Sequence, residues 1–417
     1  MNFPKLVNIR QTFSRPLVED VPGAVLAELK RLNIANQLAG KRIGITGGSR
    51  GIQNIVPILR QVVQYIKEQG GEPCLLAAMG SHGGGTEAGQ KEVLDSLGLT
   101  EAMLGAAVVT CAESEIIGHT REGIPAYIVK SALKLDGILV VNRVKTHTSF
   151  KGQVESGLVK KLVVGLGGPQ GAKQFHGFGS TELSRLLVEI GEVLLAKLPV
   201  LGGLAIIENA YEETALIQGV ATAEFIQEEN RLLAYSKSLM PLLPVDDIDI
   251  LLIGEMGKNF SGTGIDTNII GRTRIQGVTE PLSPSVKRIV VLDLSEESHG
   301  NATGIGLADF VTQRLVEKMD RQATYLNCLT STFVIRAATP IHYADDKALM
   351  EAVQYSLSSI APENLRVVAI PNTLFLTECL VSEPVARQLA VRTGVTIAGE
   401  AKPLAFDSQN RLLLNFP

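Results

Sequence analysis

Short apolar segments that end in glycine or polar clusters alternate along this chain with segments of helical periodicity. Residues 41–46, 72–80 and 137–144 are apolar runs of strand length. Residues 54–69 and 86–97 separate them and repeat apolar side chains at helical spacing. This alternation is typical of parallel strands joined by crossover helices. The sequence therefore predicts an α/β fold with mainly parallel sheets.

A second series of the same kind follows the proline-punctuated stretch MPLLPVDD at 240–247. Its expected strands lie at 249–254, 287–294 and 365–370, and its expected helices at 308–319 and 345–358. Because proline ends helices and two aspartates follow, we place a domain boundary here. At about 150 residues per domain, 417 residues allow two or three domains. We expect an N-terminal lobe of residues 1–244, a C-terminal lobe of residues 245–417 and an interlobe cleft.

The charge balance and the apolar segments limit the partners that this chain can have. Thirty-nine basic against 43 acidic residues give a net charge of −4, so no basic field indicates nucleic acid. The longest apolar stretch, 186–207, is interrupted by charged residues, and the N-terminus lacks the apolar core of a secretory signal. The four cysteines form no CxxC pair, which fits neither a zinc ribbon nor a disulfide scaffold. We expect a cytoplasmic enzyme with no membrane partner.

Chemically active side chains follow the predicted strands at their carboxyl ends, where the loops of parallel sheets converge on ligands. In chain order, these residues are Ser49, Arg50, His82, Lys145, His147, Lys258, Asn259 and His299. Three of the six histidines of the chain are among them. Histidine exchanges protons near neutral pH, so this pattern favours an active site. A histidine at the end of a single strand can equally be a solvent-facing turn residue.

The segment TGGSRG at 46–51 is similar to the nucleotide loop of short-chain dehydrogenases. However, Gln53 stands where the last glycine is expected, and Tyr127 and Lys130 are three residues apart instead of four. An NAD-type oxidoreductase therefore remains an alternative. Arg50 can hold a phosphate or a carboxylate through two hydrogen bonds in either case.

The stretch from Asn142 to His176 is too rich in glycine and lysine for a plain strand and helix. Lys160 and Lys161 lie between an SG pair and the apolar run LVVG, which ends at Gly165. Such surroundings are typical of a lysine held close to a ligand. In isolation, Lys160 could also be a solvated lysine at a helix start, and His176 a surface histidine.

At this point the chain resembles the lactate racemase family that carries the nickel-pincer nucleotide. The resemblance rests on SRG at 49–51, GSHGG at 80–84, NRVKTH at 142–147, SGLVKKL with Lys160, and His176 sixteen residues later. It covers roughly residues 40–180. The combination is specific, although each piece alone is not.

The resemblance implies a role for each matching residue. Lys160 would be the covalent anchor of the nickel-pincer nucleotide, and His176 the nickel ligand. His82 and His147 would be the acid/base pair, with Arg50 beside substrate or cofactor, and Ser49 and Gly165 would also line the cofactor. The N-terminal lobe would then bind the cofactor and the C-terminal lobe would cover the substrate. Separate enzymes would make and insert the cofactor.

The function that follows is a racemase or epimerase that inverts C2 of a 2-hydroxy acid by reversible hydride transfer to the cofactor. Two departures put lactate itself in doubt: extra residues between His147 and Lys160, and no YQ-then-Lys pattern in the second lobe. We expect Lys258 to hold the substrate carboxylate, with Asn259, His299 and Arg272 as further contacts. A sugar acid or a dicarboxylic hydroxy acid would suit them. Besides the oxidoreductase, a non-catalytic protein that binds a small acid is the other alternative.

Overall fold

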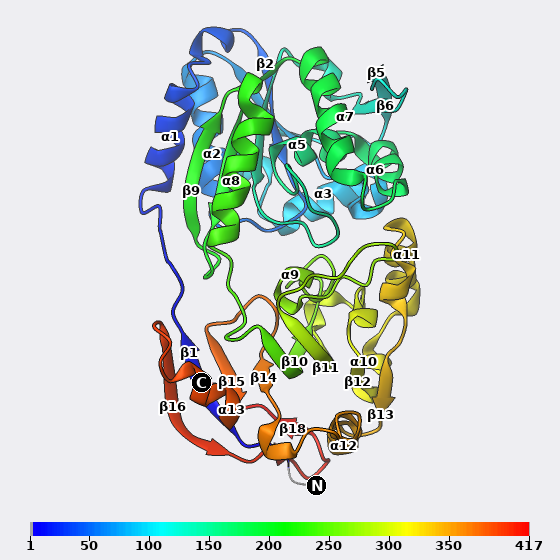
Figure 1. Cartoon of the computed structure of the whole chain (residues 1–417). Coiled ribbons are helices and arrows are strands. Elements are labelled where there is room, and N and C mark those ends of the chain that lie inside the picture. The colour runs from blue at the N-terminus through cyan, green and yellow to red at the C-terminus, as the bar shows by residue number, and fades with distance from the viewer. Residues whose placement is uncertain (1–2, 417) are drawn as a thin grey trace. The chain divides into compact units, whose positions relative to one another are not determined.

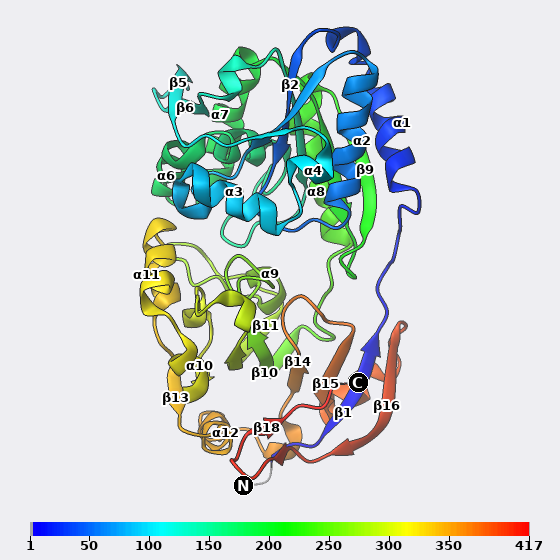
Figure 2. The same cartoon turned by 180° about the vertical axis from the view of Figure 1, so that it is seen from behind.

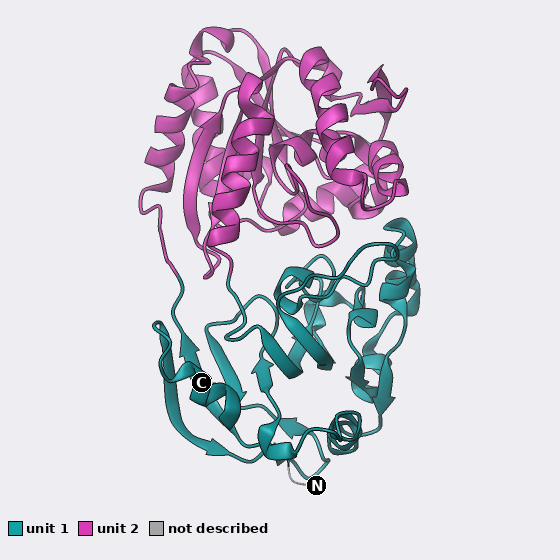
Figure 3. Cartoon of the chain, in the orientation of Figure 1, with its two compact units in different colours: residues 1–13, 241–417 teal, residues 14–240 magenta. Residues whose placement is uncertain are grey.

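The computed structural model describes residues 3–416 and divides the chain into two compact units (Figure 3). Unit 1 consists of residues 1–13 and 241–417, and unit 2 of residues 14–240. The division after Met240 lies four residues before the predicted boundary. The N-terminal segment belongs to unit 1 instead of the first lobe, because β1 (Leu6–Gln11) pairs antiparallel with β15 (Glu378–Ser382) and β16 (Val395–Lys402).

Unit 2 is built on a mainly parallel sheet with the strand order β4-β3-β2-β7-β8-β9. The strands are β2 (Arg42–Gly47), β3 (Glu72–Ala77), β4 (Ala107–Val109), β7 (Gly137–Arg143), β8 (Val200–Glu208) and β9 (Thr214–Val220). All run parallel except β9, which is antiparallel to β8. From β2 the chain moves outward to β3 and β4, and then returns to the other side of β2 at β7. This reversal makes the carboxyl ends of β2 and β7 the expected ligand crevice.

Helices cover both faces of this sheet. They are α1 (Val21–Arg31), α2 (Ile55–Glu68), α3 (Glu87–Ser96), α4 (Glu101–Leu104), α5 (Leu158–Lys160), α6 (Gly168–Gly177), α7 (Leu183–Lys197) and α8 (Phe225–Ser238). Figures 1 and 2 show α2 and α8 on opposite faces. Leu75 packs in the cluster of α1 and α2, and its neighbour Leu76 in the cluster of α7 and α8. A strand covered on both sides has apolar residues at consecutive positions, which explains the unbroken apolar runs in the sequence.

Unit 1 has a sheet with the order β13-β12-β11-β10-β14-β15-β1-β16. The strands not yet given are β10 (Asp247–Met256), β11 (Ser285–Leu294), β12 (Phe310–Thr312), β13 (Ile341–Tyr343) and β14 (Val367–Ile370). These five pair in parallel, and β15, β1 and β16 complete the sheet in antiparallel pairings. The helices are α9 (Thr267–Ile270), α10 (Gln313–Lys318), α11 (Arg321–Thr330), α12 (Asp346–Tyr355) and α13 (Glu383–Leu389). Two small hairpins, β5 (Ser114–His119) with β6 (Pro125–Val129) in unit 2 and β17 (Ala405–Phe406) with β18 (Leu412–Leu413) in unit 1, complete the fold.

The predicted α/β fold with mainly parallel sheets is confirmed. The prediction of one helix over 308–319 is wrong in its first half, because residues 310–312 form β12 and only 313–318 are helical. Phe310, Val311 and Thr312 are buried, and the pattern of one short strand cannot be told from a buried helical turn. Within residues 3–416, no helix is both long enough and apolar enough to cross a bilayer.

We predict that Ile9 on β1 is essential to the stability of unit 1. Its side chain is completely buried, and its backbone pairs with Cys379 and Ile397 on the two neighbouring strands. Ile9→Ala should lower the free energy of unfolding by about 3 kcal/mol in urea denaturation, since it leaves a cavity in the core. The adjacent Arg10 is exposed and forms a surface ion pair with Glu378, so Arg10→Ala should cost less than about 1 kcal/mol. Equal losses would contradict this role for β1.

Candidate active site

The candidate site lies at the carboxyl ends of β2, β3 and β7 in unit 2. Ser49 and Arg50 follow β2, His82 follows β3, and His147 follows β7. Because these strands are adjacent and parallel, their loops emerge at one edge of the sheet. The structure therefore brings together the polar residues that the sequence predicted for the first lobe.

Lys160 lies on a short helix that is held at its start by a buried carboxylate. The helix begins after Gly157, which has no side chain to cap it, and Glu229 of α8 accepts a hydrogen bond of 2.8 Å from the Val159 N–H instead. Burial raises the pKa of Glu229 to about 7, against hydrogen bonds from the backbone of Val159 and Leu158. Glu229 thus anchors the start of the helix that carries Lys160 to α8.

A π-helical turn over Lys161–Gly165 continues this helix, and glycines let it approach the strand ends closely. The Gly80 N–H donates to the Gly165 carbonyl at 3.1 Å. A Cβ at Gly165 would lie 2.7 Å from the Ala78 carbonyl oxygen, and a Cβ at Gly48 would collide with Lys161 Nζ. Gly165, predicted as a cofactor contact, therefore has a packing role that is visible in the structure.

The lysines of this segment form part of a cationic cluster. Burial, followed by the charges of Arg50, Lys161 and Lys145, lowers the pKa of half-buried Lys160 to about 7. Burial and the charge of Arg143 lower the pKa of Lys161 to about 8. The same two causes lower the pKa of Arg50, although part of its side chain stays exposed. Like charges are thus concentrated at the end of β2.

One positive group beside this cluster is paired with a carboxylate. Arg143, the last residue of β7, forms an ion pair with Glu208 at the end of β8, and Glu208 also accepts from the Gln53 N–H at 2.7 Å. Burial and the charges of its basic neighbours all lower the pKa of Lys160, and no negative charge raises it. The arrangement therefore suits a ligand that brings negative charge.

Aromatic rings connect Lys160 to two of the predicted site histidines. Lys160 Nζ lies 5.7 Å from the ring centre of Phe150, on which the His147 ring stacks at 4.1 Å. Phe150 also packs edge-on against Phe175, the neighbour of His176. Burial, then the charges of Lys160 and His82, lower the pKa of His176 to about 4. Lys160, His147 and His176 belong to different segments of the chain, and these ring contacts bring them close together.

The two predicted acid/base histidines hold opposite neutral tautomers. His82 Nδ1 lies 2.8 Å from the Met79 carbonyl oxygen, which can only accept, so Nδ1 carries the proton and Nε2 a lone pair. His147 Nδ1 accepts from the Ser149 N–H at 3.1 Å, so in the neutral ring Nε2 carries the proton. In the neutral state His82 presents a base at Nε2, and His147 presents a donor.

The residues between His147 and Lys160 form a loop that Glu155 anchors. This fully buried carboxylate accepts from the His147 N–H at 2.7 Å and from Lys237 of α8 at 2.8 Å. Lys145 and Ser156 pair across the base of the loop. The extra residues noted in the sequence therefore position His147.

In unit 1 the structure brings several predicted substrate contacts together after β10 and β11. The Lys258 N–H donates to Ser298 Oγ at 2.9 Å, and Lys258 Nζ donates to Asn327 Oδ1 of α11 at 2.8 Å. Asn259 Oδ1 accepts from Ser295 Oγ at 2.7 Å, and exposed His299 follows with a left-handed backbone. These groups form one polar cluster at the carboxyl edge of the unit 1 sheet.

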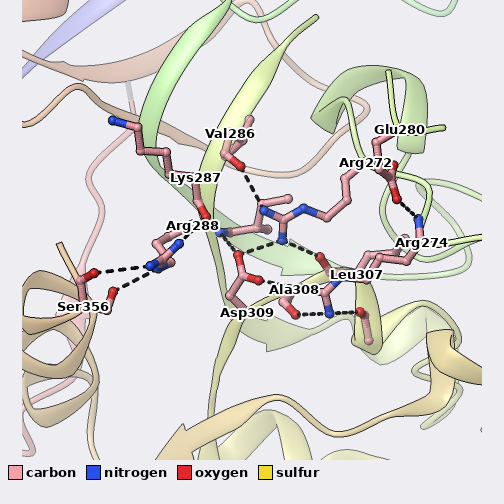
Figure 4. Close-up of polar contacts among 12 residues, drawn as sticks. Arg272, Arg274, Glu280, Val286, Lys287, Arg288, Leu307, Ala308, Asp309 and Ser356 are labelled. Carbon is pink, nitrogen blue, oxygen red and sulfur yellow. Dashed lines mark hydrogen bonds and ion pairs between the residues drawn. The ribbon is translucent and has the colours of Figure 1, made fainter. Parts of the chain in front are cut away.

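Arg272, predicted as a further substrate contact, is held by a different set of polar groups (Figure 4). Its guanidinium contacts Asp309 at 2.7 Å and donates to the carbonyls of Leu307 and Val286. Val286 is near the start of β11, about 26 Å along the strand from its end at roughly 3.3 Å per residue. Arg272 thus connects Asp309 with the backbone of Leu307 and Val286, and the structure does not place it beside Lys258.

Sequence reasoning missed Arg143, Phe150 and Glu155 as members of the site, and it noted Lys161 without giving it a role of its own. Arg143 and Phe150 are inside the segment that follows the third predicted strand, so the strand-end rule could have included them. Glu155 contacts Lys237 of α8, and Lys161 contacts Gly48 in the loop after β2. Residue spacing in the sequence does not predict these contacts between distant segments.

The comparisons with known proteins agree with this fold. A family model described as Domain of unknown function (DUF362) matches residues 53–216, within unit 2. The lactate racemase apoprotein from Thermoanaerobacterium thermosaccharolyticum superposes with a TM-score of 0.55 at 12% identity, over 88% of this chain and 93% of that one. A crystal structure of a Thermotoga maritima protein gives 0.50 at 13% identity, over 78% and 84%. A search of curated proteins gives no match. The chain has a lactate racemase-like fold.

We predict that Lys160 reacts as a neutral amine near pH 7. Its labelling by a small acylating reagent, followed by peptide mass spectrometry from pH 6 to 11, should show a midpoint near 7, because its ammonium is desolvated and repelled by Arg50. Ordinary lysines titrate near 10.4. Arg50→Gln should raise the midpoint, since it removes a repelling charge, and exposed Lys173 provides an internal control. A midpoint near 10 for Lys160 would contradict the cationic cluster.

Proposed function

We propose that this chain is an isomerase, a racemase or epimerase that inverts C2 of a 2-hydroxy acid with a nickel-pincer nucleotide tethered to Lys160. The observation that carries the proposal is the proximity of Lys160 and His176, which Phe150 and Phe175 connect and whose charges interact. The lactate racemase-like fold supports it. So does the position of the crevice, at the point where the strand order of unit 2 reverses.

The residues present fit such a cofactor. About half of an amine with a pKa of about 7 is neutral and nucleophilic at neutral pH, which covalent attachment requires. His176, with its pKa near 4, keeps a lone pair for a metal, and imidazole is a suitable nickel ligand. Arg50 and Lys161 add the positive charge that a nucleotide phosphate needs. Ser49 and Gly165 would also contact the cofactor.

When bound, the cofactor would supply reversible hydride acceptance from C2 of the substrate. The chain's own part is proton transfer at the hydroxyl group. His82 Nε2, with its lone pair, accepts the hydroxyl proton, and the Nε2–H of His147 donates a hydrogen bond to the same region. For the opposite enantiomer His147 would be the base, which requires its proton to move from Nε2 to Nδ1 and its Nδ1 contact with the Ser149 N–H to break.

The substrate contacts and the partners complete the proposal. Lys258, with Asn259 and His299 nearby, would bind a carboxylate and further polar groups of a substrate larger than lactate. Separate enzymes would build and insert the cofactor. An NAD-type oxidoreductase is the second candidate, favoured by the glycine-rich loop between β2 and α2 at the strand-order reversal.

The attachment can be tested on protein produced together with the cofactor-forming enzymes. Intact-mass analysis should show a stoichiometric adduct, which peptide mapping assigns to Lys160, and metal analysis should show one nickel per chain. Lys160→Met should carry no adduct, whereas Lys173→Met on the exposed face of α6 should be modified like the wild type. An unmodified Lys160 with reversible nicotinamide binding would instead indicate the oxidoreductase.

The roles of the histidines can be tested by following the loss of optical purity of single 2-hydroxy acids by chiral chromatography. His82→Ala and His147→Ala should each lower turnover by about 10² to 10⁴, the usual contribution of a general acid or base. The adduct at Lys160 should persist in both variants, which separates loss of catalysis from loss of cofactor. Wild-type turnover in either variant would remove that histidine from the mechanism.

A further inference from the structure

We propose that unit 2 contains a second ligand site, which binds a small carboxylate with an apolar tail. The site is a cavity of about 380 Å³, lined by residues of β3, β4 and the turn before β7. This volume is at the lower end of the range for small-molecule sites, which are mostly apolar with a few polar groups. The inference does not depend on the proposed function and concerns a different part of the unit.

The cavity is separate from the candidate active site. Arg42, the first residue of β2, lines it, whereas Ser49 and Arg50 follow the other end of that strand. The six residues of β2 span about 17 Å at roughly 3.3 Å per residue. From the start of the sheet, the cavity extends along β4 to Thr110. None of the residues that we assign to the candidate active site lines it.

The inner wall of the cavity is apolar and continuous with the core of unit 2. Cys74 and Leu76 lie on the same face of β3, and both belong to one buried cluster with Leu135. Val109 of β4 packs against this cluster. Burial raises the pKa of the Cys74 thiol, so this group stays neutral near pH 7. An uncharged wall of this kind suits a hydrocarbon tail.

A buried hydroxyl group of this cavity has no hydrogen-bond partner. Ser131 precedes the short turn Ala132–Lys134, and its side chain does not cap that turn. Within residues 3–416, Ser131 Oγ is buried and neither donates nor accepts a hydrogen bond. Buried polar groups are nearly always bonded, so this exception indicates a candidate ligand contact. Rotation about the Cα–Cβ bond can present the hydroxyl to a ligand oxygen in the cavity.

The charged residues of the cavity favour an anion over a cation. They are Arg42, Lys130, Lys134, Glu87 and Glu113. Lys130 Nζ and Glu113 form an ion pair of 2.6 Å, so these two charges compensate each other. Two basic groups then remain against the single carboxylate of Glu87, which leaves the cavity with a net positive charge.

The Arg42 guanidinium is available for the carboxylate of such a ligand. Asp136 accepts a hydrogen bond of 2.9 Å from the backbone N–H of Arg42, and among residues 3–416 the guanidinium itself has no partner. Burial is the main influence on the pKa of Cys74, and the charge of Arg42 acts against it, so the guanidinium lies near the inner wall. Lys134 Nζ also lacks a partner among these residues, and the Lys134 N–H donates to the Ser131 carbonyl at 3.3 Å. An arginine fork, a lysine and a hydroxyl together match a carboxylate.

The test measures the binding of three eight-carbon probes to the full-length protein by calorimetry. Octanoate, octan-1-ol and octylammonium share the tail and differ in the head group. Wild-type protein should bind octanoate at least about 10-fold more tightly than either of the others, because hydrogen bonds to a charged group are the stronger ones. Arg42→Met should weaken octanoate binding about 10- to 100-fold and leave octan-1-ol nearly unchanged. Ser131→Ala should weaken octanoate binding about 2- to 10-fold.

Labelling of Cys111 with N-ethylmaleimide, followed by peptide mass spectrometry, tests where octanoate binds. Cys111 lines the cavity and is only partly buried, whereas Cys379 is buried in unit 1. Octanoate at about ten times its dissociation constant should slow the labelling of Cys111 about 10-fold, because the bound ligand covers the thiol. The labelling rate of Cys379 should not change.

Two further variants make the result specific. Lys41→Met, next to Arg42 but outside the cavity, should bind octanoate like the wild type, and Arg42→Lys should keep most of the preference because it retains the charge. Equal affinity for the three probes, no measurable binding of octanoate, an unchanged rate at Cys111 or wild-type affinity in Arg42→Met would each overturn the inference. Binding that is lost in Arg50→Gln and kept in Arg42→Met would overturn it as well, because it would assign the carboxylate to the candidate active site.

Discussion

The burial of several positive charges near the carboxyl end of β2 is the constraint that the candidate site of unit 2 depends on. Desolvation lowers the pKa of Lys160, Lys161 and Arg50. The charges of Arg50, Lys161 and Lys145 lower that of Lys160 further, and the charge of Arg143 lowers those of Lys161 and Arg50. Such an arrangement persists only when the surrounding structure imposes it. Glu229 fixes the start of the lysine-bearing helix, and Gly48, Gly80 and Gly165 allow it to pack against the strand ends. A bound anion would stabilise the charged forms of these groups, and this favourable interaction would contribute to its binding.

The same packing sets the chemistry of the histidines. The Met79 carbonyl and the Ser149 N–H are ordinary backbone groups, yet one makes His82 a donor at Nδ1 and the other makes His147 an acceptor there. Glu155 ties the His147 loop to α8, so this tautomer is supported by a buried network. Loop geometry therefore determines which ring nitrogen offers a lone pair to a substrate.

Sequence patterns predicted much of the fold and the membership of the first-lobe site. Strands such as 137–143 and helices such as 55–68 follow from local periodicity, and the rule for strand ends placed Arg50, His82 and His147 at one edge. Strand pairings between segments that are far apart in the sequence could not be predicted from local patterns. Nothing in residues 6–11 shows that they join a sheet with residues 378–402, and nothing near Arg272 shows that Asp309 holds its guanidinium. Lys161 was visible beside Lys160, but its contact with Gly48 required the fold.

The most direct test is nickel K-edge X-ray absorption on protein purified from cells that make the cofactor, with His176→Ala compared to the wild type. Convergence of Lys160 and His176 on one cofactor predicts one imidazole nitrogen among the nickel ligands of the wild type, and loss of the imidazole signal in the variant. A wild-type protein without nickel, or a shell that does not change when His176 is removed, would contradict it.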